Sequence, residues 1–257
     1  MDIIDLRDTR DFGLLEHVYN ELYLACFTDP DEQEDLEQYR TRLFDSQLPI
    51  PQPETHFLVA GENLSDPKSR VIGGFMICEL YRESSCGLLT YIAVSPAMRG
   101  RGLGRILLRR AIDVLKVRCT GPQGLRAILA ETHDPAQTDP ASDAMSPRDR
   151  IEVMKKLGAY LVPVHYVQPE LRPGDGRSRK LLLITFALDE HAKPSVSGKA
   201  LTDFMHEFYR ALGVTNPDVD LDYLQIKSDT HSTVTGQFIR KMTDIAQNLN
   251  MSMIQLS

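Results

Sequence analysis

The chain is poor in cysteine, with only Cys26, Cys78, Cys86 and Cys119 among its 257 residues. None of the four belongs to a C-x-x-C pair or stands at zinc-ligand spacing from a histidine, so the sequence gives no support for a metal site. Cys78 and Cys86 flank a predicted hairpin and could face each other across it. Because nothing marks the chain for export, we expect packed, reduced thiols instead of a disulfide.

Long apolar runs are also absent from the sequence. The longest candidate, residues 181–188, is long enough for a buried strand only, whereas a helix that spans a bilayer needs about 18 apolar residues or more. The first ten residues are acidic and lack the basic and apolar regions of a secretory signal. We therefore expect a cytoplasmic protein without a membrane partner.

Positive charge is in deficit over the whole chain. The 29 Lys and Arg residues are outnumbered by 36 Asp and Glu, and the net charge of -7 argues against nucleic acid as the main partner. One segment departs from this balance, with arginines at positions 99, 101, 105, 109 and 110. A local positive patch on an acidic chain predicts a small anionic ligand.

The first hundred residues read as helices followed by strands. A short strand is expected within 2–8, an apolar helical face over 12–26, and a second helix start in the acidic run 29–37. Three strand-like runs, 56–62, 70–82 and 85–94, are separated by turn-prone residues and predict an antiparallel meander.

Helices and strands alternate in the rest of the chain. A helix is expected after Gly104, with an apolar face made of Leu103, Ile106, Leu107, Ala111, Val114 and Leu115. Further strands are expected at 125–131, 160–168 and 179–188, and further helices at 146–157, 200–212 and 234–249. Ser146 and Pro147 supply the start signals of the first of these helices, and Gly158 its stop.

The sequence RGRGLG, residues 99–104, lies between the strand that ends at Val94 and the helix that follows. Glycines allow a close approach to the backbone, and unpaired N–H groups at a helix start bind anions, so this turn suits a phosphate. It is not a P-loop, because Gly104 is followed by Arg and Ile where Lys and Ser or Thr are required. The dinucleotide pattern G-x-G-x-x-G fails as well, because Arg105 stands in place of its last glycine.

The pattern Arg99-x-x-Gly102-x-Gly104 after such a strand resembles the pyrophosphate-binding motif of the GNAT superfamily of acyl-CoA-dependent N-acetyltransferases. The flanking elements occur in the order that this family shows. The resemblance covers residues 1–190 and implies an α/β domain with a mixed, mostly antiparallel sheet and helices on both faces. Residues 191–257 are expected to form a helical C-terminal extension.

The resemblance implies acetyl-CoA as the co-substrate. Its pyrophosphate would lie on the N–H groups of the glycine turn, and its pantetheine arm in a gap where the strands that contain Val94 and Glu131 splay apart. An N–H near Val94 would hold the thioester oxygen. The residues implied in cofactor binding are Ile92, Ala93, Val94, Arg99, Gly100, Arg101, Gly102, Leu103, Gly104 and Arg105.

Acyl transfer to an amine needs a base for the amine and an acid for the departing thiolate. For the base, strand alternation favours Glu131, with Glu79 and His133 as alternatives. Each of these also has a purely structural reading, as an ion-paired strand residue or as a loop histidine.

For the acid, members of the family commonly carry a tyrosine at the position of Met154. Tyr160 and Tyr166 are the nearest substitutes, and Tyr166 is favoured because it precedes a proline-rich loop. Three further patterns recur in a less characterised branch of the family, namely E-x-x-D-P at Glu131, S-P-x-x-R at Ser146 and Y-V-Q-P at Tyr166.

We therefore predict an N-acetyltransferase that uses acetyl-CoA to acylate a small-molecule amine, as a monomer or homodimer and without a metal. Two alternatives stay open: an acyl-CoA-binding sensor or scaffold without turnover, and an acyltransferase that uses its C-terminal helices to dock a protein target.

Overall fold

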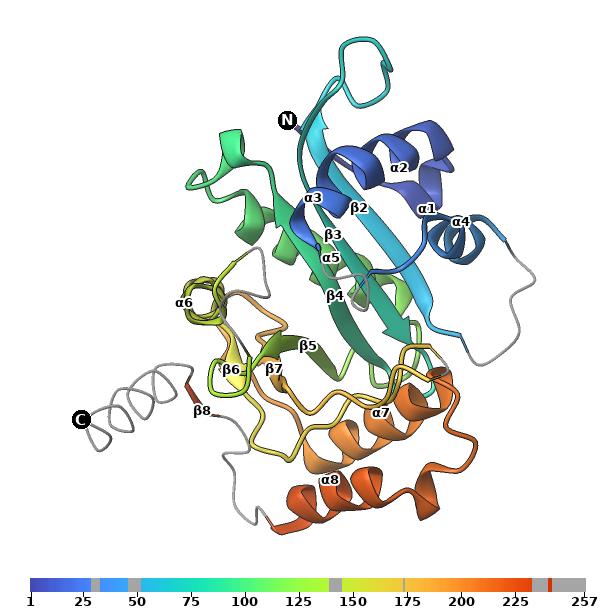
Figure 1. Ribbon diagram of the computed structural model, residues 1–257, viewed down its shortest axis with the longest axis vertical. Coiled ribbons are helices and arrows are strands. Elements are labelled where there is room, and N and C mark those ends of the chain that lie inside the picture. Colours follow the sequence, from blue (N-terminus) through green and yellow to red (C-terminus); the bar gives the residue numbers. More distant parts are fainter. Residues whose placement is uncertain (29–32, 46–51, 139–144, 173, 233–239, 242–257) are drawn as a thin grey trace. The chain divides into compact units, whose positions relative to one another are not determined.

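The computed structural model of the chain describes residues 1–28, 33–45, 52–138, 145–172, 174–232 and 240–241 (Figure 1). The chain divides into two compact units. The first comprises Met1–Arg82 and Gly87–Leu125, and the second comprises Glu83–Cys86 and Arg126–Ser257.

The first unit is built on the strands β1 (Asp2–Asp5), β2 (Glu54–Glu62), β3 (Val71–Tyr81) and β4 (Cys86–Val94), which lie side by side in this order. β2 pairs in an antiparallel register with both β1 and β3. The predicted meander is thus confirmed, with each strand displaced by at most a few residues from its expected bounds.

Short helices cover one face of these strands. They are α1 (Leu6–Thr9), α2 (Phe12–Val18), a π-helical turn (Tyr19–Tyr23), α3 (Leu24–Cys26) and α4 (Leu36–Phe44). Their apolar side chains form one core cluster with Phe57, Phe75 and Ile77 of the sheet. Aromatic rings dominate this core: Tyr23 stacks on Tyr19 with a centroid distance of 4.9 Å. The helix predicted from the acidic run begins later than expected, at Leu36, and residues 29–32 lie outside the described part of the chain.

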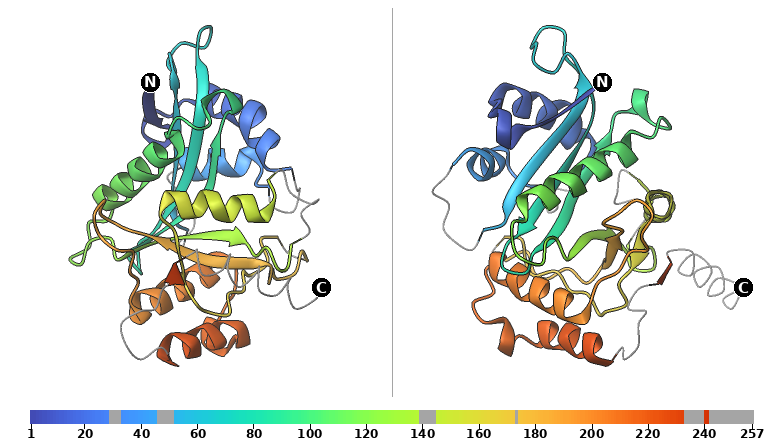
Figure 2. Two further views of the ribbon diagram at one scale, coloured as in Figure 1. Left: turned by 90° about the vertical axis from the view of Figure 1, so that its left-hand side faces the viewer. Right: turned by 180° about the vertical axis from the view of Figure 1, so that it is seen from behind.

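Helix α5 (Leu103–Arg118) packs on the opposite face, as Figure 2 shows. Two glycines of β3 let it approach closely, because a Cβ at Gly73 would meet Leu103 at 3.1 Å and one at Gly74 would meet Leu107 at 3.3 Å. The predicted apolar face of α5 is confirmed except at Ile106, which is 45% exposed. The face that packs on the sheet also includes Leu108 and Ile112, so the helix is rotated from the predicted stripe.

The second unit contains the strands β5 (Ala127–His133), β7 (Leu181–Phe186), β6 (Tyr160–Leu161) and β8 (Arg240–Lys241), paired in this order and antiparallel. Helix α6 (Pro147–Leu157) starts at the predicted cap, where the Ser146 hydroxyl accepts a hydrogen bond from Asp149 N–H, and ends at Gly158 with φ +90°. Helices α7 (Gly198–Ala211) and α8 (Leu221–Ser232) pack against each other and form a helical extension.

Two predicted elements of this unit are wrong in extent. The strand expected over 160–168 is reduced to Tyr160–Leu161, because Pro163 has no N–H to continue the ladder. The second C-terminal helix was expected over 234–249, whereas the structure has α8 at Leu221–Ser232, and the described residues Arg240–Lys241 are a strand. The other residues of that predicted helix lie outside the described part of the chain.

All four cysteines are free thiols, as expected, and Cys78, Cys86 and Cys119 are buried. Burial raises the pKa of the Cys86 thiol to about 12, which makes it unreactive at neutral pH. Within the described ranges, no cluster of three or more His, Cys, Asp or Glu side chains could hold a metal ion. None of the helices described combines the length and apolar character needed to cross a bilayer.

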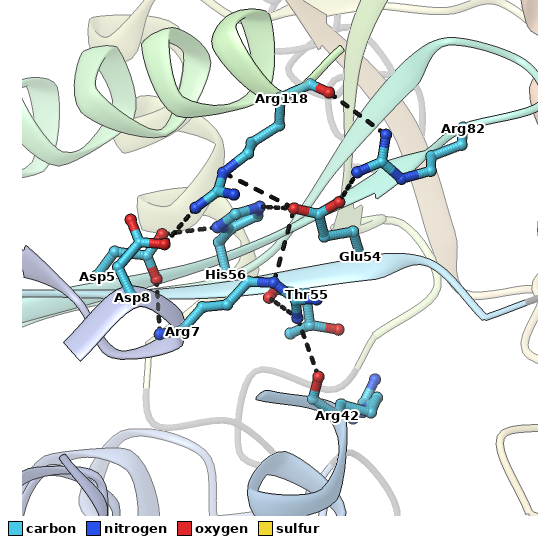
Figure 3. A network of polar contacts seen from close by, with 9 residues as sticks. All are labelled: Asp5, Arg7, Asp8, Arg42, Glu54, Thr55, His56, Arg82 and Arg118. Atoms are coloured by element: carbon cyan, nitrogen blue, oxygen red, sulfur yellow. Dashed lines mark hydrogen bonds and ion pairs between the residues drawn. The ribbon is translucent and has the colours of Figure 1, made fainter. Parts of the chain in front are cut away.

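A buried histidine is the centre of a polar network at the edge of the first unit. His56 of β2 contacts two carboxylates, Asp5 through Nδ1 at 2.6 Å and Glu54 through Nε2 at 3.1 Å. Figure 3 shows that arginines from three other elements surround this group. Arg7, Arg82 and Arg118 all form ion pairs with Glu54. The network thereby connects β1, α1, β2, the end of β3 and the end of α5.

This network predicts how stability depends on pH. Burial by itself would lower the pKa of His56, but hydrogen bonds to Asp5 and Glu54 outweigh it and raise that pKa above 6.5. Burial opposes the ionised form of Glu54 too, yet its bond to His56 and the charges of Arg82, His56 and Arg7 lower its pKa from 4.5 to about 2. The stabilisation by His56 is full below pH 6.5 and is lost as the pH rises through the raised value. That by Glu54 is full above pH 4.5 and is lost towards pH 2.

We expect His56→Gln to destabilise the protein by about 3 kcal/mol at pH 6, because the buried carboxylate of Asp5 loses the charge that faces it and Glu54 loses one of its four cationic partners. The urea midpoint of the natural chain should fall between pH 6.5 and pH 9, and the variant should lose most of this fall. Circular dichroism at a series of pH values measures both effects. The exposed His191 offers a control, and equal pH profiles for the natural chain and His56→Gln would contradict the prediction.

Candidate functional site

The glycine turn of the first unit presents backbone N–H groups at the start of a helix. After a short 3₁₀ turn at Pro96–Met98, the chain takes positive φ at Gly100 (+75°) and Gly102 (+79°), and α5 begins at Leu103 with Gly102 as its cap. No side chain caps this helix end. Among the described residues, no backbone hydrogen bond uses the N–H of Gly100, Arg101 or Gly102. The turn thus offers a cluster of donors together with the positive end of a 16-residue helix dipole.

The arginines of the patch surround this turn. Arg99, Arg101, Arg105 and Arg110 are exposed, and Arg109 is half-buried. The side chain of Arg99 folds back and donates from Nε to the carbonyl of Val94 at 3.2 Å, which joins the turn to the end of β4. Exposed guanidinium groups beside unpaired N–H donors form a site whose charge and geometry suit a phosphate or diphosphate.

The end of β4 carries the other predicted cofactor residues. Ile92 and Val94 are half-buried and Ala93 is buried. The backbone here lies very close to β3, because a Cβ added to Gly74 would stand 2.7 Å from the carbonyl oxygen of Ala93. Ser95 N–H donates to the Gly73 carbonyl at 2.9 Å and ends this pairing. A strand with a fixed end therefore leads directly into the glycine turn.

The second unit brings together two residues that were predicted separately. The Tyr166 hydroxyl donates a hydrogen bond to Oε1 of Glu131, although the two residues are 35 positions apart. Gln168 donates from Nε2 to the same oxygen at 2.8 Å. Tyr166 is buried and Glu131 half-buried. A carboxylate joined to a phenol can pass a proton to it, which is the relation that a coupled base and acid require.

Tyr166 owes its position to an irregular segment and not to the predicted strand. After Pro163, two consecutive tight turns form, in which Val164 N–H donates to the Val162 carbonyl at 2.9 Å and Tyr166 N–H to the Val164 carbonyl at 2.8 Å. The periodicity of the sequence does not predict this contact. The sequence offers only the two motifs, one at Glu131 and one at Tyr166, and Gln168 belongs to the motif at Tyr166.

The two other candidate bases have different surroundings. His133 was predicted as a loop residue, but it is the last residue of β5 and is buried, two positions from Glu131 and so on the same face of the strand. Glu79 belongs to the first unit, whereas Glu131 belongs to the second. Its buried carboxylate accepts hydrogen bonds from Arg42 at 3.0 Å and from the Tyr81 hydroxyl at 3.1 Å. These contacts are those of a structural ion pair.

The position where the family commonly has a tyrosine is in the last turns of α6. Met154 lies there, four residues before the helix stop Gly158, and is half-buried. A thioether cannot donate a proton, so an acid must come from another residue. Tyr160, the other substitute considered, lies in the short strand β6.

Comparisons with known proteins identify a family over part of the chain. Residues 17–138 match the model of the acetyltransferase (GNAT) family. None of the curated proteins matches the sequence.

Three solved structures illustrate the similarity. A protein from Bacteroides thetaiotaomicron assigned to the GNAT family is 18% identical, with a TM-score of 0.51 over 84% of this chain and 98% of its own. The yncA protein of Salmonella typhimurium, assigned as an acetyltransferase and solved with its cofactor acetyl-CoA, is 23% identical, with a TM-score of 0.43 over 76% and 98%. Spermidine N-acetyltransferase SpeG of Vibrio cholerae, in a mutant form, is 14% identical, with a TM-score of 0.44 over 73% and 95%.

The first of these structures shows the fold, a mixed α/β arrangement with mostly antiparallel strands, and so confirms the predicted fold class. The family match includes the strand β4, the glycine turn and α5, which are the elements that carry the predicted resemblance. The segment 17–138 therefore matches the GNAT family of acetyltransferases.

Proposed function

We propose that the protein is an N-acetyltransferase that transfers the acetyl group of acetyl-CoA to the primary amine of a small molecule by direct attack on the thioester. The observation that carries the proposal is the glycine turn, where backbone N–H groups at the start of α5 have no backbone partner among the described residues. A diphosphate satisfies such donors and also gains from the helix dipole.

The cofactor-binding part of the proposal uses residues 92–94 and 99–105. The N–H groups of the turn hold the diphosphate, and the exposed Arg101 and Arg105 add charge around it. A backbone N–H near Val94 holds the thioester oxygen and stabilises the negative charge that develops on it during attack.

The chemical part assigns Glu131 as the base and Tyr166 as the acid. Glu131 first takes a proton from the ammonium group of the acceptor and releases it to solvent. The neutral nitrogen then attacks the thioester carbon and loses its next proton to Glu131, and the carbon–sulfur bond breaks. The departing thiolate takes the phenolic proton of Tyr166, and Tyr166 recovers a proton from Glu131 along their hydrogen bond. The sum is amide and free thiol, with both residues returned to their initial states. His133, on the same face of the strand, is the alternative base.

Glu131 is preferred to Glu79 because of what surrounds each carboxylate. Glu79 is held by Arg42, Tyr81 and Thr55 in the interior of the first unit, so a proton taken up by Glu79 would break its ion pair with Arg42. Glu131 accepts hydrogen bonds from a phenol and an amide, two groups without a formal charge, so protonation at Glu131 breaks no ion pair with either of them.

Titration calorimetry with CoA and with its fragment pantetheine, which lacks both the diphosphate and the 3′-phosphoadenosine, tests the cofactor assignment. We expect CoA to bind with a micromolar dissociation constant, and pantetheine, which lacks the diphosphate, to bind at least a hundredfold more weakly. Higher salt should weaken CoA binding only, because the contacts concerned are ionic and exposed. Absence of heat with CoA, or equal affinity for the two ligands, would remove the assignment.

Turnover is tested by the release of free CoA thiol from acetyl-CoA in the presence of spermidine, tyramine or lysine. An increase in thiol release with an amine, matched by the acetylated amine in mass spectrometry, supports N-acetyl transfer. Tight CoA binding without any amine-dependent release favours the alternative role of a sensor or scaffold. This alternative is supported by position 154, where the chain has a methionine and not the tyrosine that is common in the family.

A further inference from the structure

The segment that carries Tyr166 is fixed by the C-terminal helices on either side of that residue. His165 N–H donates to the Asp229 carboxylate of α8 at 2.8 Å, and the His165 ring nitrogen Nδ1 lies 3.1 Å from the same oxygen. The Tyr209 hydroxyl of α7 donates to the Val167 carbonyl at 2.7 Å. Tyr209 is fully buried. The residues immediately before and after Tyr166 are thus each hydrogen-bonded through the backbone to a different helix of the extension.

The next residue of the segment, Gln168, is fixed as well. Its backbone forms an isolated bridge with Ser178, with two hydrogen bonds of 3.0 Å. The neighbouring Arg177 forms ion pairs with Asp220 and Asp222, which lie at the start of α8. The guanidinium of Arg177 also lies 5.9 Å from the ring centroid of Tyr209. The loop that returns from Gln168 is therefore clamped to the same two helices.

These contacts fix a segment that has no strand pairing of its own. Residues 162–167 are not part of a strand, so no ladder of hydrogen bonds sets the direction of the Tyr166 side chain. A phenol that shares a proton with a carboxylate must stay within hydrogen-bond distance of it, since small displacements reduce the rate strongly. Something other than the sheet has to hold the segment.

We propose that the helical extension, through Tyr209 of α7 and Asp229 of α8, is the element that positions Tyr166 and Gln168 against Glu131. The inference rests on the proposed function, because it gives the extension a part in acyl transfer and not in the docking of a protein target. Tyr209 and Asp229 are positioning residues, which act on the reaction only through Tyr166 and Gln168.

The test compares Tyr209→Phe and Asp229→Ala with a matched control, Tyr223→Phe. Tyr223 is also a buried tyrosine of the extension, but its hydroxyl makes no hydrogen bond within the described residues. With acetyl-CoA and the best of the three probe amines, each positioning variant should lower kcat by about fivefold to tenfold, the scale of one lost hydrogen bond. The KM for acetyl-CoA should stay within about twofold, and Tyr223→Phe should behave like the natural chain.

A double-mutant cycle separates positioning from general destabilisation. If Tyr209 acts through Tyr166, then Tyr209→Phe should have little further effect in a Tyr166→Phe background. Additive losses in the double variant, or unchanged kcat in both positioning variants while Glu131→Gln and Tyr166→Phe are slow, would overturn the inference. If Glu131→Gln and Tyr166→Phe themselves turn over normally, it is the proposed function that fails.

Hydrogen–deuterium exchange provides a readout that does not need turnover. Tyr209→Phe should speed exchange of the amides in 164–168 by about tenfold, and Tyr223→Phe should leave them unchanged. Equal exchange in this segment for the natural chain and Tyr209→Phe would overturn the inference even if none of the probe amines is a substrate.

Discussion

Gly102→Asp is expected to weaken CoA binding at least a hundredfold. Gly102 has φ +79°, a conformation that side chains rarely adopt, and it stands directly before the first residue of α5. An aspartate there would place a negative charge at the site proposed for the diphosphate, next to the N–H donors that should hold it. The charge alone acts at a few ångströms from two phosphates, where repulsion is strong. Calorimetric titration with CoA measures the effect.

Gly124→Asp is a matched control for this experiment. Gly124 also belongs to the first unit, has φ +61° and, like Gly102, has no atom within 4 Å of the position where a Cβ would be. The two substitutions therefore carry similar backbone strain and the same new charge, but only one stands at the start of α5. We expect Gly124→Asp to lower the melting temperature as much as Gly102→Asp and to bind CoA normally. Equal losses of CoA affinity in both would show that strain, and not the anion site, causes the effect.

The elements of the first unit could largely be predicted because local signals and long-range packing agree there. The apolar runs 56–62 and 70–82 form strands that are buried on both faces, and the stripe of α5 forms a helix that is buried on one face. The error at Ile106 arose because the chain has apolar residues on more of α5 than one stripe can bury, and the sheet determines which of them face inward. The π-helical turn at Tyr19–Tyr23 has no period of its own in the sequence, so it reads as ordinary helix.

In the second unit, the local sequence predicts the structure less well. The strand expected at 160–168 has suitable composition, but Pro163 and two tight turns prevent it. The pairing of Glu131 with Tyr166 depends on a backbone path set by contacts to Tyr209 and Asp229, 43 and 63 positions beyond Tyr166. Residue types at a site can be predicted from motifs, whereas the partners that orient them come from distant parts of the chain.

Glu131→Gln is expected to lower kcat for amine acetylation by about a hundredfold or more near neutral pH, with CoA affinity unchanged. The substitution removes the base but preserves the local geometry. The Tyr166 hydroxyl and the Gln168 amide both donate to Oε1 of the carboxylate, so the amide oxygen of glutamine can accept from them in the same way. General bases typically contribute a factor of 10² to 10⁴. Steady-state rates of thiol release across pH 6 to 10 measure the loss.

The pH profile and a second variant decide whether the loss reflects lost base catalysis. Without a base, the enzyme has to wait for amine that is already neutral, so the rate of Glu131→Gln should rise with pH in proportion to the free amine, and the gap to the natural chain should narrow. Glu79→Gln should give the opposite result. It removes the buried charge that faces Arg42 at 3.0 Å, so stability should fall by about 3 kcal/mol while kcat at a temperature where the fold persists stays the same. A large loss of kcat in Glu79→Gln, with normal turnover in Glu131→Gln, would exchange the two assignments, because the base would then lie in the first unit.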